Sequence, residues 1–340
     1  MNERFQPGPD GAYRRIPLEP HQLLSQRTPT EDVFVLAHLG VPEVSAGEWS
    51  FEIGGLVDSP VRFTLADLHA LPRHAVESLH QCAGNPAHPE IPTRRVSNVV
   101  WAGASLLELL ETAGVREDAS HLWTYGADSG TFAGAQVDAY LKDLPMWRIA
   151  TGDVLVAYEL NGKPLPIEHG YPARLLVPGY YGTNSVKWIT RMTLADHRAD
   201  GLFTTKLYND EVAPDGTHAA PRMQPVYDIA PESVIVSPAP DAVLGLDGMT
   251  VWGWAWAANG VSHVEFSDDG GKTWRNASLE SRSQWSWQRF SSEWKPKGTG
   301  PHQLMSRAFT TTGEVQPVSG KRNAIHAVSV EVKNERSKKQ

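Results

Sequence analysis

The pattern of apolar residues changes near residue 231, and this change limits the folds that are open to the chain. Before it, short helical patterns such as TLADLHALP and ASLLELLETAG alternate with strand patterns such as EWSFEIGGLV. After it, short strands recur at a spacing of about ten residues, separated by Asp-Gly and Gly-Gly turns, and no helical pattern is left. A mixed segment followed by strands alone predicts two domains of different class.

These patterns divide the 340-residue chain into four predicted segments. Residues 1–32, which are rich in Pro, Gly and Gln, are expected to form an irregular lead-in. Residues 33–230 are expected to form an α+β domain, and residues 231–332 an all-β immunoglobulin-like sandwich. Residues 333–340 are a charged tail that we expect to fray.

Charge and cysteine content exclude several classes of protein. Lys and Arg number 31 and Asp and Glu number 39, so the formal net charge is −8, and no basic block suggests a nucleic-acid surface. The apolar stretch over residues 243–261 contains Asp247 and Asn259, so we expect no membrane span. Cys82 is the only cysteine, which excludes an intrachain disulfide, a four-cysteine metal site and a CxxCH haem.

The amino-terminal sequence bears on the compartment. Arg14 and Arg15 are followed by IPLEP and not by the apolar stretch of an export signal. We therefore expect a cytoplasmic protein, or a periplasmic one if a leader has been removed.

Cys82 is the residue that bears most directly on chemistry. It stands in HQCAGNP, where a predicted strand runs into a turn of small residues that leaves room beside the thiol. A cysteine can be a small buried hydrophobe, a soft metal ligand, or a nucleophile with His80, His38 or His169 as its base. The residues alone leave these three interpretations open.

Tryptophan is concentrated in the predicted sandwich. Trp252, Trp254 and Trp256 alternate along one strand and must share a face. That face is expected to be a packed core or an interface with the first domain or another subunit, with a carbohydrate platform as a third possibility.

Three blocks of the sequence resemble the sulfite oxidase family. LHQCAGNPAHPEIPTRRVSNVVWAGASLLELLETAG is similar to the family's molybdenum-binding segment, and DVLVAYELNGKPLPIEHGYPARLLVPGYYGTNSVKWITRMTL to its cofactor-clamping segment. SPAPDAVL, VWGWAWA, VEFSDDGGKTW and RAFTTTGEVQP resemble its carboxy-terminal dimerisation domain. The resemblance implies a sulfite-oxidase-type molybdopterin-binding domain followed by the sandwich.

The resemblance also implies a cofactor and its ligands. A molybdenum–molybdopterin (a pyranopterin dithiolene) supplies two sulfurs of its own, so that one protein thiolate, Cys82, completes the metal site. Tyr208, in FTTKLYN, is implied as the catalytic tyrosine. The implied cofactor-binding residues are His38, Asn85, Asp128, His169, Arg174, Ser185 and Lys187.

The chain departs from the family where sulfite oxidases gather arginines around the substrate anion. Those positions hold Leu36, Pro86 and Ala87. Because charge-assisted pairs with arginine are the strong ones, their loss argues against sulfite itself and favours a less charged sulfur or nitrogen oxo-compound. Lys206, His88, Arg94, Arg95 and Arg322 are candidates to compensate.

We therefore expect a molybdopterin-dependent oxidoreductase that performs oxygen-atom transfer on a small sulfur oxo-compound. Its electrons are expected to pass to an external carrier such as a cytochrome, and the sandwich is expected to form a homodimer. Two other classes stay open at this point: a cysteine-nucleophile hydrolase or transferase that uses Cys82, and a non-catalytic binding protein on the same fold.

Overall fold

The computed structural model describes residues 5–7, 13–85, 91–212 and 222–334. The chain forms two compact units, each built from separate segments. Unit 1 comprises residues 1–16, 34–76 and 99–227, and unit 2 comprises residues 17–33, 77–98 and 228–340. The predicted domains are continuous in sequence, and their bounds stay a prediction. Among the described residues, none of the helices is long and apolar enough to cross a membrane.

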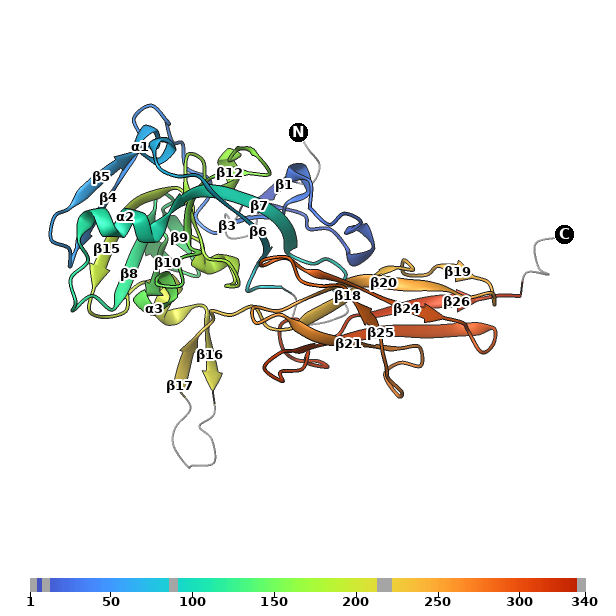
Figure 1. Cartoon of the computed structure of the whole chain (residues 1–340). Helices are drawn as coiled ribbons and strands as arrows, with labels where there is room; N and C mark the ends of the chain where they lie inside the picture. The colour runs from blue at the N-terminus through green and yellow to red at the C-terminus, as the bar shows by residue number, and fades with distance from the viewer. Residues whose placement is uncertain (1–4, 8–12, 86–90, 213–221, 335–340) are drawn as a thin grey trace. The chain divides into compact units, whose positions relative to one another are not determined.

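The largest sheets of the first half of the chain have five strands each (Figure 1). One has the order β11 (Leu141–Pro145), β8 (His121–Gly126), β15 (Ile189–Ala195), β4 (Ser50–Gly55), β5 (Val61–Thr64). The other has the order β13 (Lys163–Pro164), β12 (Leu155–Leu160), β7 (Val96–Ser105), β6 (His74–Gln81), with β14 (Arg174–Leu176) paired to β12. Only the β15–β4 pair is parallel among the described pairs of these two sheets.

Smaller sheets and short helices complete this part of the chain. The smaller sheets are β1 (Phe5–Pro7), β2 (Tyr13–Arg15) and β3 (Val35–Ala37); β9 (Gly130–Phe132) and β10 (Ala135–Val137); and β16 (Asn209–Val212) and β17 (Arg222–Pro225). The helices are α1 (Leu65–Ala70), α2 (Leu106–Ala113), α3 (Met146–Ile149), the 3₁₀ turns η3 (Ile167–His169) and η4 (Gly182–Asn184), and the π-helix η5 (Leu202–Lys206). Few and short helices among strands confirm the expected fold.

Local sequence signals explain the two predicted helices. The Thr64 hydroxyl accepts from the Asp67 N–H, and the Asp67 carboxylate accepts from the Thr64 N–H, which closes a capping box at the start of α1. Ser105 caps α2, and Gly114 ends it in the left-handed conformation at φ +68°. The apolar face of α2 then packs into a core that includes Phe51, Ile53, Leu109, Leu122, Val156, Leu175, Ile189 and Met192.

The predicted lead-in is not wholly irregular. Tyr13–Arg15 pairs with Val35–Ala37, and Phe5–Pro7 pairs with Tyr13–Arg15. Pro20–Gln22 (η1) and Thr30–Asp32 (η2) form single 3₁₀ turns. Each of these strands is only three residues long, which is too short for a periodic pattern of apolar residues to be recognised in the sequence. The strands form because a partner strand from later in the chain pairs with them. Of the predicted tail, residues 335–340 lie outside the described residues.

The carboxy-terminal part of unit 2 contains two sheets that form the predicted sandwich, and most of their strand pairs are antiparallel. The first has the order β18 (Glu232–Ser237), β20 (Met249–Trp256), β24 (Gln288–Trp294), β23 (Ser278–Leu279). The second has the order β19 (Val243–Leu244), β26 (Ala327–Val332), β25 (Gly300–Thr310), β21 (Val261–Ser267), β22 (Arg275–Asn276). Side chains from both sheets form the core of the sandwich, which includes Ile235, Val251, Val264, Phe266, Phe290, Leu304, Val328 and Val330.

The tryptophan face of β20 packs within unit 2. Trp254 and Trp256 are buried, and the Trp254 ring stacks on Trp287 at 4.8 Å between centroids. The indole N–H groups of Trp254 and Trp287 donate to the backbone oxygens of Leu23 and Gln26 at 2.7 and 2.9 Å. Trp256 Nε1 also donates to Gln81 Oε1 at 3.0 Å, and Gln81 belongs to the predicted first domain, so the packed-core and interface interpretations of this face both stay open.

Candidate functional site

The predicted site residues are divided between the two units. Cys82 and Asn85 belong to unit 2. Unit 1 holds the other seven: His38, Asp128, His169, Arg174, Ser185, Lys187 and Tyr208.

Cys82 is buried in a turn directly after β6. The turn is closed by the Asn85 N–H, which donates to the Cys82 carbonyl at 3.0 Å, and the Cys82 N–H donates to the Arg95 carbonyl at 3.0 Å. The Gly84 N–H points at the thiol sulfur, 3.3 Å away. A Cβ on Gly84 would lie 3.1 Å from Arg95 Nη1 and 3.6 Å from Cys82 Sγ, so a larger residue would press on the Arg95 guanidinium and make ordinary contact with the thiol.

Two arginines lie beside this turn. Arg95 Nη1 donates to the Gly84 carbonyl at 2.8 Å, and Arg322 Nε donates to the Ala83 carbonyl at 3.1 Å. Burial raises the pKa of the Cys82 thiol, and the positive charges of Arg95 and Arg322 oppose that rise. The thiol is therefore poorly ionised by itself, and a bound metal ion would favour its thiolate.

The other candidate cations are placed differently. Arg94 is buried and paired with Glu232, so it does not serve as a free cation, and Lys206 is exposed on η5. His88, Pro86 and Ala87 lie outside the described residues. Leu36 stands where an arginine was expected, and its backbone carbonyl accepts from Lys187 at 3.1 Å.

Unit 1 brings four predicted cofactor ligands together around Arg174. The buried guanidinium donates to the carbonyls of His169 and Ser185 at 3.0 and 2.8 Å and lies over the Trp101 ring at 4.8 Å. Lys187 Nζ donates to the carbonyl of Glu168, the neighbour of His169, at 3.0 Å. Arg174 at the start of β14 and Lys187 between η4 and β15 thus place two cations beside the η3 turn.

The two cations of this group have no described hydrogen bond to a carboxylate, although Asp128 and Glu168 attract Lys187 electrostatically. The hydrogen bonds that Arg174 and Lys187 make with the described residues all go to backbone carbonyls. Burial lowers the pKa of Arg174 to about 9 and that of Lys187 to about 7, while burial raises the pKa of Asp128 to about 6 against the attraction of Lys187. The buried Asp128 Oδ1 has no hydrogen bond to the described residues.

These features fit the cofactor that the sequence implies. A phosphate group would supply the negative charge that Arg174 and Lys187 lack, and such charge-assisted contacts are strong where water is excluded. Asp128 provides an acceptor for an N–H of a heterocycle. The donor set therefore suits an anionic ligand with a hydrogen-bonding ring.

His38 and Tyr208 meet at a second place in unit 1. His38 Nε2 and Tyr208 Oη lie 2.5 Å apart, and the imidazole is stacked at 5.6 Å on the Phe203 ring. Tyr208 adopts φ +58°, a conformation that bulky residues rarely occupy, two residues after the last residue of the η5 π-helix. Strained residues and π-helical turns both concentrate at functional sites, which agrees with a catalytic role for this tyrosine.

Lys142 is a buried residue of this region that sequence reasoning missed. It is 1% exposed, its Nζ donates to the Phe203 carbonyl at 2.8 Å, and it lies 5.6 Å from the centre of the Tyr208 ring. Burial lowers the pKa of Lys142 to about 8. The sequence offered a partial signal, because Lys142 stands beside Leu141 and Asp143 in β11 (LKDLP) and must find an acceptor when the strand is buried.

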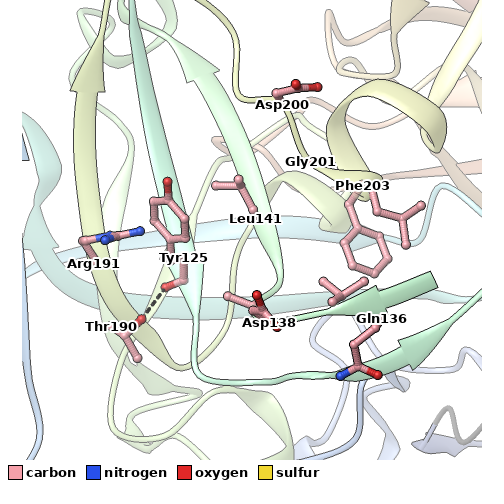
Figure 2. A pocket seen from close by; sticks show the side chains of 12 residues that line it. Tyr125, Gln136, Asp138, Leu141, Thr190, Arg191, Asp200, Gly201 and Phe203 are labelled. Atoms are coloured by element: carbon pink, nitrogen blue, oxygen red, sulfur yellow. Dashed lines mark hydrogen bonds between the residues drawn. The ribbon is translucent and has the colours of Figure 1, made fainter.

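A cavity of about 570 Å³ is lined in part by Phe203 (Figure 2). Tyr125, Leu141, Arg191 and Asp200 also line it, and the Arg191 guanidinium stacks at 4.0 Å over the Tyr125 ring. None of the predicted site residues lines this cavity. Phe203 thus both lines this cavity and stacks on His38.

Comparison with protein families identifies both parts of the chain. The family model of the oxidoreductase molybdopterin binding domain matches residues 38–203, and that of the Mo-co oxidoreductase dimerisation domain matches residues 223–334. These matches confirm the expected order of domains and the expected molybdopterin cofactor.

Individual relatives agree. Mouse mitochondrial sulfite oxidase is 31% identical over 335 residues, and chicken sulfite oxidase is 30% identical over 328 residues, each over 88% of this chain. The chain spans 59% of the mouse protein and 70% of the chicken protein. Among solved structures, the sulfane dehydrogenase SoxCD from Paracoccus pantotrophus superposes with a TM-score of 0.80 at 29% identity, over 97% of this chain and 86% of that one.

The family models, the relatives and the structural match all point to one assignment. The chain belongs to the sulfite oxidase family of molybdopterin-dependent oxidoreductases.

Proposed function

We propose that the protein oxidises a small anionic sulfur oxo-compound by oxygen-atom transfer. The observation that carries this proposal is the pair of arginines on the Cys82 turn, Arg95 and Arg322, which bring positive charge to the predicted metal ligand from positions other than those of sulfite oxidases. The similarity to sulfite oxidases and to a sulfane dehydrogenase supports sulfur as the reacting element.

The predicted residues have distinct roles toward the cofactor. When bound, the molybdenum cofactor supplies two-electron oxygen-atom transfer chemistry. The Cys82 thiolate would bind the metal, and Arg174, Lys187 and His169 would hold the phosphate-bearing end of the pterin. Asp128 would accept a hydrogen bond from the pterin ring. The described partners of the Asn85 side chain are protein groups, so Asn85 would act by holding the turn.

Tyr208 and His38 would handle a proton of the reaction. The 2.5 Å separation of Tyr208 Oη and His38 Nε2 lets the imidazole accept or donate the proton that the phenol shares. The reaction adds one oxygen atom from water to the substrate and releases two protons and two electrons. The histidine and tyrosine give one of these protons a defined first acceptor.

The charge of the site favours one kind of anion. Arg95 and Arg322 attract negative charge, whereas Leu36 adds none at the position of a family arginine. A singly charged sulfinate therefore suits the site better than the more highly charged sulfite. We propose that the released electrons pass to an external carrier such as a cytochrome, and that the sandwich, which matches a dimerisation domain, pairs two subunits.

The cysteine-nucleophile alternative is less well supported. The contacts of Cys82 with the described residues include no histidine ring, and burial raises the pKa of its thiol. A nucleophilic cysteine needs a base or a lowered pKa. The non-catalytic alternative predicts a folded protein that binds no molybdenum, which metal analysis tests directly.

Steady-state oxidation by the cofactor-loaded protein tests the substrate. With ferricyanide as acceptor, methanesulfinate and sulfite should be oxidised, methanesulfinate with the higher kcat/KM, and neutral dimethyl sulfide should not. Replacing Arg322 by Met should raise the KM for methanesulfinate about 10- to 150-fold, because a hydrogen bond to a charged group contributes about 1.5–3 kcal/mol. The matched control is Arg275→Met, which removes an exposed arginine of β22 in the same unit.

Two results would overturn the substrate assignment. One is faster oxidation of dimethyl sulfide than of either anion. The other is an Arg322→Met variant whose KM for methanesulfinate equals that of Arg275→Met.

A further inference from the structure

A carboxylate of the sandwich lies beneath the Cys82 turn. Glu232 is the first residue of β18 and is fully buried, as is Arg94, whose Nε lies 3.1 Å from Glu232 Oε1. Both residues belong to unit 2. A buried ion pair is seldom the most stable solution for a core, because both charges lose their hydration. Its presence calls for a reason other than stability.

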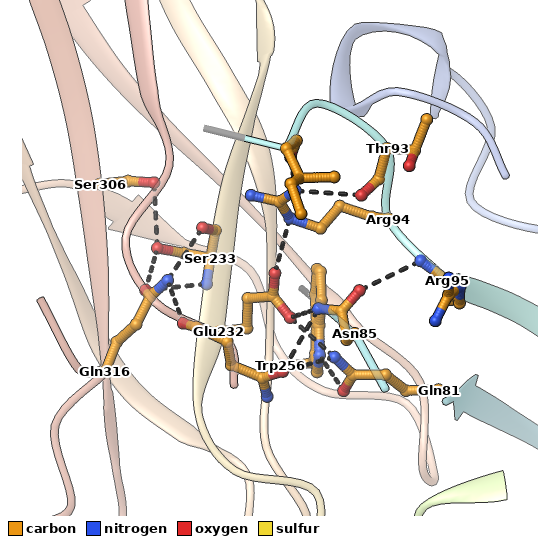
Figure 3. A network of polar contacts seen from close by, with 12 residues as sticks. Gln81, Asn85, Thr93, Arg94, Arg95, Glu232, Ser233, Trp256, Ser306 and Gln316 are labelled. Atoms are coloured by element: carbon orange, nitrogen blue, oxygen red, sulfur yellow. Dashed lines mark hydrogen bonds and ion pairs between the residues drawn. The ribbon is translucent and has the colours of Figure 1, made fainter. Parts of the chain in front are cut away.

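The Glu232 carboxylate also binds the residues on both sides of the cysteine (Figure 3). Its Oε2 accepts from Gln81 Nε2 at 2.7 Å and from Asn85 Nδ2 at 2.8 Å. Gln81 directly precedes Cys82, and Asn85 follows it by three positions. One carboxylate therefore holds both ends of the turn that presents the thiol.

The remaining groups of these two amides are also engaged. Gln81 Oε1 accepts from Trp256 Nε1 at 3.0 Å, and Asn85 Oδ1 accepts from the Arg95 N–H at 3.1 Å. Asn323 Oδ1 accepts from Gln81 Nε2 at 2.8 Å. Neither amide can rotate without breaking several hydrogen bonds, so the position of the turn depends on all of them together.

An ionised carboxylate is the group that suits this place. Glu232 receives hydrogen bonds from three donors, on Arg94, Gln81 and Asn85. A glutamine would place an N–H against at least one of these donors, because an amide has only one oxygen. Burial raises the pKa of Glu232 to about 6, although Arg94 opposes the rise.

The sign of this pKa shift indicates a cost to folding. A raised pKa means that Glu232 contributes stability when it is protonated, below its ordinary value of 4.5, and that this contribution is lost as the pH rises through about 6. At neutral pH the charged form is therefore kept at the expense of stability.

We propose that Glu232 is a positioning residue for the Cys82 thiolate, and that the sandwich strand β18, through Glu232 and Arg94, fixes the geometry of the molybdenum-binding turn. This inference rests on the proposed role of Cys82 as the metal ligand.

The single cysteine makes a direct test possible. In the cofactor-free folded protein, alkylation by iodoacetamide reports on Cys82 alone. Glu232→Gln should raise the alkylation rate of Cys82 at least tenfold and lower the molybdenum content after cofactor loading. Circular dichroism shows that the variant is folded before either measurement.

The matched control is Ser233→Ala, at the next residue of β18. The Ser233 hydroxyl donates to Gln316 Oε1 at 2.8 Å and accepts from the Ser306 hydroxyl at 3.0 Å, and it has no described contact with the turn. This variant weakens a buried polar network of the same unit, so it should lower the unfolding temperature while leaving the alkylation rate and the molybdenum content unchanged.

A double variant keeps the test decisive if Glu232→Gln does not fold. Arg94→Met combined with Glu232→Gln removes both buried charges together, which proteins commonly tolerate. It should also alkylate faster and hold less molybdenum. The proposal is overturned if either folded Glu232 variant has the wild-type alkylation rate of Cys82 and the wild-type molybdenum content. It is also overturned if Ser233→Ala changes these two quantities as much as the Glu232 variants do.

The two proposals fail in different ways. A wild-type protein that binds no molybdenum refutes the proposed function, whereas the alkylation rates of the cofactor-free variants still report whether Glu232 positions the thiol.

Discussion

Replacing Lys142 by Met should stabilise the protein at pH 7. The ammonium is 1% exposed, and it makes one described hydrogen bond, to the Phe203 carbonyl. Burial lowers its pKa from 10.5 to about 8. Since one pKa unit corresponds to about 1.4 kcal/mol, holding the charge in the folded state costs about 3 kcal/mol at pH 7. Loss of the hydrogen bond offsets about 1 kcal/mol of the gain, so the net stabilisation is about 2 kcal/mol.

The pH dependence distinguishes this effect from ordinary packing. Between pH 8 and 10.5 the unfolded chain binds the Lys142 proton and the folded protein does not, so wild-type stability rises with pH in this range. Lys142→Met lacks this contribution, and its advantage over the wild type should fall to less than about 1 kcal/mol by pH 10. Contributions from other titrating groups cancel in the difference between the two proteins.

Urea unfolding at pH 7 and pH 10, followed by circular dichroism, measures both quantities. Lys163→Met is the control, since Lys163 is an exposed residue of β13 in the same unit. A Lys142→Met protein that is less stable than the wild type at pH 7, or whose stability difference is the same at both pH values, would refute this reasoning.

Three further results are expected. Cys82→Ser should fold but hold little molybdenum after cofactor loading, because a serine hydroxyl is a far weaker ligand than a thiolate; metal analysis would contradict the assignment if the content stayed at the wild-type level. Tyr208→Phe removes the hydroxyl bonded to His38 and should lower kcat about a hundredfold with a smaller change in KM; steady-state kinetics with an unchanged kcat would exclude the proton-handling role. Lys187→Met should raise the unfolding temperature of the cofactor-free protein, because a cation held in a desolvated place is removed, and should lower the amount of bound pterin measured by fluorescence. A lower unfolding temperature with an unchanged amount of pterin would show that Lys187 is structural.

Local signals predicted the elements that depend on neighbouring residues. The helix that starts at Thr64 and the one that ends at Gly114 follow from capping chemistry within a few positions. The strand-to-turn position of Cys82 follows in the same way from HQCAGNP. Each of these features is decided by contacts that are short in sequence.

Long-range contacts were beyond such reasoning. Gln81 and Glu232 are 151 positions apart, and nothing in either local sequence shows that one binds the other. The strands Phe5–Pro7 and Tyr13–Arg15 likewise exist because a later strand pairs with them. The π-helix Leu202–Lys206 was missed because a single widened turn has no periodic pattern.

The candidate site was predicted only in part, because some of its residues have a recognisable local sequence and others depend on long-range contacts. The segment that contains His169, Arg174 and Lys187 could be recognised from its sequence, and the structure places the partly buried Lys187 beside the buried His169 and Arg174. Lys142 and Glu232 were overlooked because a charged residue in a buried strand needs a partner, but the local sequence does not identify that partner.

Because unit 2 is built from three separate segments of the chain, its sandwich cannot be exchanged between proteins as one continuous fragment. A fragment that begins at residue 228 would lack residues 17–33 and 77–98, which provide the acceptors for the indole N–H groups of Trp254, Trp256 and Trp287. The three indole rings would then be exposed to water, and the fragment would tend to aggregate. Exchanging this half between relatives therefore requires grafting all three pieces of chain at once.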